Sequence, residues 1–333
     1  MKTFANAIWE QNEYDYKAAY GFIPNIHAYL HDDDENRDCM IVVPGGGYCM
    51  CVPPEASIPA VEFYNRGMNV FVLTYTTDMT FAVPLGKQPE NDLARAVRFI
   101  RKRANEYKIA GKKLIVCGFS AGAHVCGSVA VHFKTITDCN PEYADISCRP
   151  DGAILSYPVI TTGEYTHEFS VLALLGKDPS KEELDYFSLE KNVSEDTAPC
   201  FLWQTANDNL VPVENSYLFA KALMEKGVYF AHYVFPDGFH GLSVPNADFF
   251  AGKFEEYTME QVMRAVKAVK NGEGVDVTAE RVKELKEQFK DEEDKDKEGE
   301  QNPFANADID PVELFSDVGH WPDLAMKWME RIH

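Results

Sequence analysis

The sequence lacks any long apolar run. Residues 1–10 carry neither an apolar core nor a cleavage-like pattern, and no later stretch is long enough to cross a bilayer. We therefore expect a cytoplasmic protein with neither a secretory signal nor a membrane span. Positive charge is also scarce, since 32 lysines and arginines stand against 53 acidic residues, giving a formal net charge of −21. Nucleic acid and anionic membranes repel such a chain, so we expect neither as a partner.

The sequence also offers no disulfide framework and no common zinc pattern. Eight cysteines are present, but several lie within apolar runs, where a thiol packs as a small hydrophobic group. The close pair Cys49 and Cys51 has a spacing that fits no common zinc site. These observations predict a reduced protein without structural disulfides.

Apolar and amphipathic runs alternate along most of the chain, which predicts an α/β fold. The expected strands are 26–30, 39–43, 69–75, 114–117, 152–160, 199–205 and 229–235. Several are apolar throughout, as strands of a parallel sheet are when both faces are covered. We therefore predict a mainly parallel central sheet with helices on both faces. Residues 1–24 are expected to form an arm laid over it.

One segment combines a strand, a serine between glycines and a helix. Residues 114–117 lead into Gly-Phe-Ser-Ala-Gly at 118–122, and a helix-compatible run follows. This pattern is typical of a nucleophile elbow, in which a sharp turn lifts the hydroxyl of Ser120 off the sheet. Glycines allow such a turn, and the helix N-terminus favours negative charge beside it. A plain strand-to-helix turn is the alternative, because the five-residue pattern also occurs by chance.

Three glycines, Gly45, Gly46 and Gly47, follow an expected strand. In esterases with a His-Gly-Gly-Gly loop, the backbone N–H groups of this segment donate to the tetrahedral oxyanion, although Pro44 replaces the histidine here. We predict an oxyanion hole formed by these glycines and the N–H of Ala121. A flexible loop or a phosphate cradle is the alternative, but no Lys-Ser or Lys-Thr pair follows, which excludes a P-loop.

A base and a carboxylate for Ser120 are predicted in the order that α/β-hydrolases use. Asp208 and His240 each follow an expected strand, so both should lie at the same sheet edge as Ser120. We predict that His240 takes the serine proton and that Asp208 orients the imidazole. Glu214 is the alternative carboxylate, whereas His232 lies within a strand and is expected to pack.

Three aromatic residues are candidates for the wall of the substrate pocket. Tyr48, Tyr157 and Trp203 lie next to the predicted site in sequence, and aromatic faces suit both acyl methyls and sugar rings. Core packing is the alternative for Trp203, which lies inside an expected strand.

Taken together, the motifs resemble a known family. Beyond the glycine loop and the elbow, the resemblance rests on Tyr-Pro-Val-Ile at 157–160, Leu-Leu-Gly at 174–176, Val-Pro-Val-Glu-Asn-Ser at 211–216 and Phe-His-Gly-Leu-Ser at 239–243. The chain is similar to acetyl-xylan-esterase-like α/β-hydrolases, which are related to the hormone-sensitive-lipase group and often labelled xylanase or lipase. This resemblance covers most of residues 20–243 and 318–331. It implies deacetylation of carbohydrate esters such as acetylated xylo-oligosaccharides, without a metal or organic cofactor. A glycosidase would instead need two facing carboxylates.

Residues 244–316 depart from the family pattern. They contain a helical run at 253–270 and an almost purely charged run at 291–300. We expect one hydrolase domain made of 1–243 and 317–333, with 244–316 inserted into it. The insertion is expected to cap the site or an oligomer interface, and a tolerated surface insertion is the alternative. A homo-oligomer is left open.

Other functions stay open at this point. A general short-chain carboxylesterase would use the same residues. A serine peptidase of the prolyl-oligopeptidase type shares the order of the triad, but it would carry a large additional domain. A catalytically silent α/β-hydrolase that only binds a ligand is a third alternative, and the intact set of Ser120, Asp208 and His240 argues against it.

Overall fold

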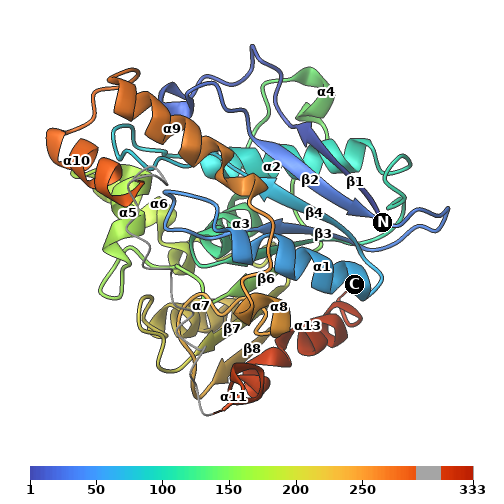
Figure 1. The fold of residues 1–333 in the computed structure, drawn as a ribbon. Helices are drawn as coiled ribbons and strands as arrows, with labels where there is room; N and C mark the ends of the chain where they lie inside the picture. Colours follow the sequence, from blue (N-terminus) through green and yellow to red (C-terminus); the bar gives the residue numbers. More distant parts are fainter. Residues whose placement is uncertain (290–308, 333) are drawn as a thin grey trace.

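The computed structural model describes residues 1–289 and 309–332. Their strands form one eight-stranded sheet in the order β1-β2-β4-β3-β5-β6-β7-β8 (Figure 1). The strands are β1 (Lys2–Ala7), β2 (Asn25–Leu30), β3 (Cys39–Val43), β4 (Asn69–Thr74), β5 (Leu114–Phe119), β6 (Gly152–Ser156), β7 (Cys200–Thr205) and β8 (Phe230–Phe235). The strands β3 to β8 run parallel, and β2 pairs antiparallel with both β1 and β4. The predicted α/β fold with a mainly parallel sheet is therefore confirmed.

The expected arm over residues 1–24 is partly wrong, because it begins with a strand. β1 is polar and largely exposed, and it lies at the edge of the sheet beside β2. Backbone hydrogen bonds to β2 stabilise it in place of burial, so it lacks the apolar signature that reveals the inner strands.

Helices cover both faces of the sheet, as predicted. One face packs against α2 (Gln88–Lys102), α3 (Ala121–His132) and α7 (Glu214–Glu225), whose apolar side chains join the larger core cluster. The other face packs against α1 (Ser57–Asn65) and α13 (Trp321–Met329), which contribute Phe63, Trp321 and Trp328 to a second cluster (Figure 1). In the described ranges no helix is both long enough and apolar enough to cross a membrane.

The connection between β6 and β7 carries two short helices, α5 (Glu168–Leu175) and α6 (Lys181–Phe187). Ser180 caps α6, with Glu183 reaching back to the Ser180 N–H in a capping box. This connection begins at the carboxyl edge of the sheet, where ligands bind in parallel α/β folds.

Residues 244–289 and 309–316 pack onto the α/β core. The described helices are α8 (Ala247–Phe250), α9 (Glu260–Asn271), α10 (Ala279–Gln288), α11 (Pro311–Leu314) and α12 (Ser316–Gly319). Figure 1 shows α9 and α10 at one end of the molecule and α11 at the other. Val262, Val266 and Val269 of α9 belong to the same core cluster as the sheet. The charged run 291–300 lies outside the described residues, and the division into a domain and an insertion stays a prediction.

A hydrogen bond joins the chain before the 244–316 stretch to the chain after it. Trp321 Nε1 at the start of α13 donates to the Ser243 carbonyl, with a separation of 2.8 Å. Both groups are buried, and the indole also stacks on Trp203 of β7. The loop that carries His240 is therefore fixed against the C-terminal helix.

Candidate active site

Ser120 lies in the turn between β5 and α3. Its backbone adopts φ 52° and ψ −119°, a conformation that costs energy for a residue with a side chain and that tends to occur at functional sites. The flanking glycines are required by close approach. A β-carbon at Gly118 would lie 2.3 Å from the Gly122 oxygen, and one at Gly122 would lie 2.1 Å from the Val43 oxygen. The sequence thus produces the predicted elbow geometry.

The three residues of the predicted triad lie within hydrogen-bond distance of one another. His240 Nε2 is 2.8 Å from Ser120 Oγ, and His240 Nδ1 is 2.9 Å from Asp208 Oδ2. The Asp208 side chain is fully buried, and that of His240 is 9% exposed. Asp208 occupies the position for which Glu214 was the alternative. This arrangement brings a hydroxyl, an imidazole and a carboxylate into the order that proton transfer requires.

Asp208 is held by donors in addition to the histidine. The backbone N–H groups of Leu210 and Val211 donate to Oδ1 at 2.9 and 3.0 Å, and Gln204 Nε2 donates to Oδ2 at 3.2 Å. Burial alone raises the pKa of Asp208, but hydrogen bonds from His240 and these N–H groups outweigh it and lower the pKa below its ordinary value. Asp208 is therefore a carboxylate near neutral pH.

The glycine loop narrows the set of predicted oxyanion donors. The Gly45 N–H donates to Glu55 Oε2 at 2.7 Å, so the prediction of Gly45 as a donor is wrong. Gly46 and Gly47 line the cavity in front of Ser120, with φ values of 122° and 60° that favour glycine. Ala121 is the first residue of α3, so its N–H has no partner within that helix. Gly46, Gly47 and Ala121 remain the predicted donors.

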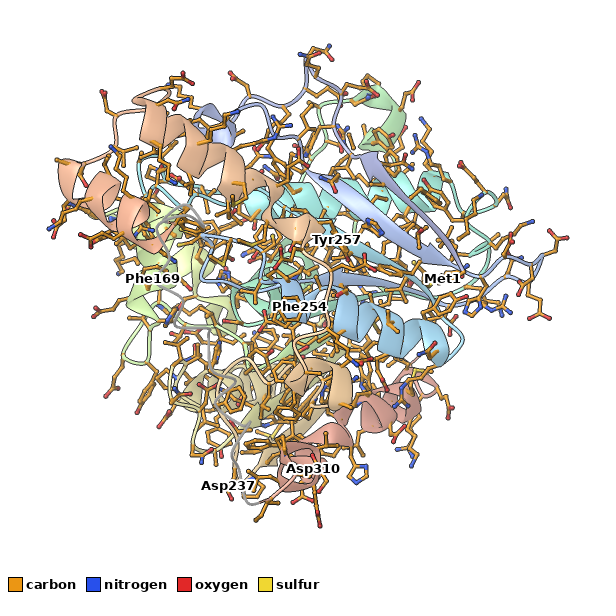
Figure 2. The ribbon with its side chains drawn as sticks, viewed as in Figure 1. Met1, Phe169, Asp237, Phe254, Tyr257 and Asp310 are labelled. Carbon is orange, nitrogen blue, oxygen red and sulfur yellow. The ribbon has the colours of Figure 1, made fainter. Side chains whose placement is uncertain are left out.

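A cavity of ≈ 480 Å³ opens at Ser120. Its walls combine apolar and polar groups, and they come from five loops around the carboxyl edge of the sheet. The lining residues are Gly46, Gly47, Val52, Glu55, Ser120, His167, Phe169, Leu210, His240 and Gly241. Figure 2 shows Phe169 on the side of the molecule that carries α9 and α10. Across residues 1–289 and 309–332, no group of three or more His, Cys, Asp or Glu side chains could hold a metal ion.

The predicted aromatic wall is wrong, because all three side chains are buried beside or beneath the cavity. Tyr48 donates or accepts a 2.6 Å hydrogen bond with His124 Nδ1, and Trp203 stacks on Trp321 in the core. Tyr157 comes nearest to the site, with its ring 4.8 Å from that of His240. Tyr48 and Tyr157 follow strands that reach the site, and Trp203 lies within β7, but all three side chains pack into the protein rather than toward the ligand space.

The wall is built instead by residues that sequence reasoning did not select. His167, Phe169 and Leu210 lie in loops or at a helix start, where no periodic pattern indicates which way a side chain points. His167 Nδ1 is 2.8 Å from Ser170 Oγ. Burial lowers the pKa of His167, and the neighbouring His240 lowers it further. Glu55, also missed, ends a short 3₁₀ turn just before α1.

Comparison with known proteins agrees with this geometry. A serine on a strained turn between a parallel strand and a helix, with its histidine and aspartate at the same sheet edge, defines the α/β-hydrolase class. The BD-FAE family model matches residues 26–223, more than half of the chain, and the chain belongs to that family. The resemblance to acetyl-xylan-esterase-like α/β-hydrolases is confirmed.

Individual relatives carry names from xylan degradation. Endo-1,4-beta-xylanase B of Butyrivibrio fibrisolvens is 66% identical over 270 residues, covering 81% of this chain and 42% of that protein. An acetylxylan esterase of Xylanibacter ruminicola is 28% identical over 222 residues, covering 64% of this chain and 42% of its own. This chain thus spans less than half the length of these two relatives. Among solved structures, this chain is similar to an acetyl ester-xyloside bifunctional hydrolase from Caldicellulosiruptor lactoaceticus. The two share 33% sequence identity and superpose with a TM-score of 0.68, and the match covers 81% of this chain and 96% of that one.

Proposed function

We propose that this chain is a serine ester hydrolase that deacetylates carbohydrate esters such as acetylated xylo-oligosaccharides. The observation that carries the proposal is the 2.8 Å approach of His240 Nε2 to Ser120 Oγ, with buried Asp208 behind the imidazole. The relatives named as acetylxylan esterase and acetyl ester-xyloside hydrolase support the choice of ester. A reducing cytoplasm suits its eight free cysteines.

The mechanism follows from the geometry of the triad. His240 Nε2 takes the proton of Ser120 as Oγ attacks the acetyl carbonyl, and the protonated imidazole then gives that proton to the departing sugar hydroxyl. Asp208 holds the imidazole orientation through Nδ1 and stabilises its positive charge. Water, activated by the same histidine, then releases acetate from Ser120.

The tetrahedral oxyanion would be bound by the N–H groups of Gly46, Gly47 and Ala121. These are the predicted donors left once Gly45 is paired with Glu55. Each donor contributes about 3–4 kcal/mol to transition-state stabilisation in comparable enzymes. Their loss should lower kcat more than it raises KM, because the oxyanion exists only in the transition state and intermediate.

The cavity suits a short acyl group and a polar alcohol. Val52, Phe169 and Leu210 offer apolar surface for the acetyl methyl, whereas His167 offers a hydrogen-bonding group for a sugar hydroxyl. Residues 1–243 with 317–333 form the hydrolase domain in this proposal, with 244–316 as its insertion. The site does not support xylanase chemistry, because Glu55 is the one acidic residue that the described ranges contribute to the cavity lining and glycoside hydrolysis needs two carboxylates.

The test measures acetate release from acetylated xylo-oligosaccharides, beside a peptide substrate and unacetylated xylan. We expect acetate release by the wild type and its loss in Ser120→Ala. Ser128→Ala is the matched control, since Ser128 lies buried on α3 and its hydroxyl has no partner among the described residues. Acetate release that survives Ser120→Ala would refute the mechanism. Faster cleavage of the peptide would favour the peptidase, and no turnover of any ester would favour a binding protein.

A further inference from the structure

We propose that Glu55 is a positioning residue that joins the oxyanion loop to the loop carrying His240. This inference rests on the proposed esterase function and adds a residue outside the triad to it. Glu55 ends the 3₁₀ turn η2 (Pro53–Glu55) just before α1, and its side chain lines the cavity together with Ser120 and His240.

The Glu55 carboxyl is buried without a cationic partner. The residue is 3% exposed, and no lysine or arginine of the described ranges pairs with it. Burying a carboxyl is costly unless hydrogen bonds satisfy its oxygens. Both oxygens of Glu55 are used: Oε2 accepts the Gly45 N–H at 2.7 Å, and Oε1 accepts the Tyr157 hydroxyl at 2.7 Å. The two bonds connect segments that are 10 and 102 residues away.

The first bond fixes the start of the oxyanion loop. A β-carbon at Gly45 would lie 2.8 Å from Glu55 Oε2 and 2.8 Å from Ser120 Cβ, so the Gly45 backbone lies close to both the carboxyl and the nucleophile. Gly46 and Gly47, the predicted oxyanion donors, follow directly along the chain. The carboxyl therefore sets how the donor loop is placed relative to Ser120.

The second bond fixes the His240 side of the site. Tyr157 donates its hydroxyl to Glu55, accepts the Ser243 N–H at 3.1 Å, and presents its ring to the edge of His240. Tyr157 has a φ of 37°, a conformation that persists only where several contacts determine it. The Ser243 hydroxyl also donates to the Pro54 carbonyl at 3.1 Å. The turn that holds Glu55 is therefore attached to the His240 loop at two points.

Burial and hydrogen bonding act on the Glu55 carboxyl in opposite directions. Burial raises the pKa of Glu55, and the hydrogen bonds from Tyr157 and Gly45 offset part of that rise. The role of Glu55 therefore rests on the two hydrogen bonds that it accepts.

The experiment compares Glu55→Gln, Glu55→Ala and Tyr157→Phe with the wild type, using p-nitrophenyl acetate. Glu55→Ala loses both bonds, and we expect kcat to fall about 10²-fold with little change in KM, as when an oxyanion donor is lost. Glu55→Gln keeps the shape and can still accept the Gly45 N–H, so its kcat should be intermediate. Tyr157→Phe keeps the ring against His240 but removes the hydroxyl, and its effect should not add to that of Glu55→Gln.

Glu62→Gln on α1 is the control, because its carboxylate binds Arg66 away from the cavity, and we expect wild-type kinetics. Thermal unfolding of every variant separates misfolding from mispositioning, and Glu55→Gln with Tyr157→Phe keeps the test decisive should Glu55→Ala not fold. Wild-type kcat in folded Glu55→Gln and Tyr157→Phe, or a rise in KM alone, would overturn the role of Glu55. Activity in Ser120→Ala would instead overturn the proposed function, so the two failures are distinguishable.

Discussion

The ring of Phe169 packs directly on the backbone of Gly47. A β-carbon at Gly47 would lie 2.9 Å from Phe169 Cδ1 and 3.1 Å from Cε1. Phe169 belongs to α5, in the connection between β6 and β7, whereas Gly47 follows β3. The β6–β7 connection therefore packs over the glycine loop, and the Phe169 side chain limits the space above Gly47.

Phe169→Ala should widen the acyl end of the cavity. We expect kcat/KM for butyryl and hexanoyl esters to rise by at least about 10-fold relative to the acetyl ester, because one additional methylene accommodated in an apolar pocket is worth about 1–3 kcal/mol. A panel of p-nitrophenyl esters that differ only in chain length measures this. Tyr229→Ala, an exposed aromatic just before β8, serves as control. An unchanged chain-length preference would show that Phe169 does not bound the acyl site.

The helical part of 244–316 touches the same wall indirectly. Arg281 of α10 donates from Nε and Nη2 to the Met79 carbonyl at 3.0 and 2.8 Å, and its guanidinium lies over the Phe81 ring. Phe81 in turn packs edge-to-face on Phe169, with ring centroids 4.9 Å apart.

Arg281→Ala should therefore shift the chain-length preference in the same direction as Phe169→Ala, by a smaller factor. The same ester panel measures it, with Arg264→Ala as the matched control, since Arg264 on α9 pairs with Glu260 at the surface. If Arg281→Ala behaves as Arg264→Ala does, the idea that this stretch influences the site loses its support.

Asp208→Asn should lower kcat by about 10⁴-fold while leaving the fold intact, because an amide favours the wrong imidazole tautomer.

The lowered pKa of Asp208 also gives a stability prediction. A carboxyl whose pKa is lower in the folded state stabilises the fold above its unfolded-state pKa, and that contribution is lost as pH falls through the folded-state value. Urea unfolding between pH 6 and the acid range should show a shallower acid loss in Asp208→Asn than in the wild type.

His167→Ala should separate sugar esters from simple esters. Because burial lowers its pKa, His167 is a neutral hydrogen-bonding group near pH 7 and not a cation. We expect kcat/KM on acetylated xylo-oligosaccharides to fall about 10-fold, in line with one lost hydrogen bond of about 1 kcal/mol or more. Activity on p-nitrophenyl acetate should stay within about 3-fold of the wild type. An equal loss on both substrates would assign His167 to the general architecture of the site.

The inner strands, the elbow and the approach of Asp208 and His240 followed from local patterns. Apolar runs mark buried strands, and in a parallel sheet all strand ends of one kind meet at one edge, so residues just after strands come together. β1 was not predicted, because a strand at the exposed edge of a sheet needs no apolar side chains. The sequence did not show that Gly45 is unavailable to the oxyanion. Its N–H donates to the carboxyl of Glu55, ten residues further along, and no local pattern indicates that contact.

The cavity wall shows the same limit. A residue's place after a strand predicts that it reaches the site, but not the direction of its side chain. Tyr48 follows β3 and lies beside the site, yet its side chain is buried in the core. Trp203 lies within β7 and packs in the core, which was the alternative for it, whereas His167 and Phe169 were missed. Their positions depend on how α5 packs over the glycine loop, which is a tertiary property.

The bond between Trp321 and Ser243 joins the chain just before the 244–316 stretch to the chain just after it. If that stretch is an insertion, this bond keeps the two flanking segments together whatever the length of chain between them. Loop-closure cost grows only slowly with length, so this stretch can be lengthened or replaced at little thermodynamic expense. A replacement must still cover the surface that Val262, Val266 and Val269 bury. The surroundings of the cavity can thus be redesigned through this stretch while His240 keeps its place.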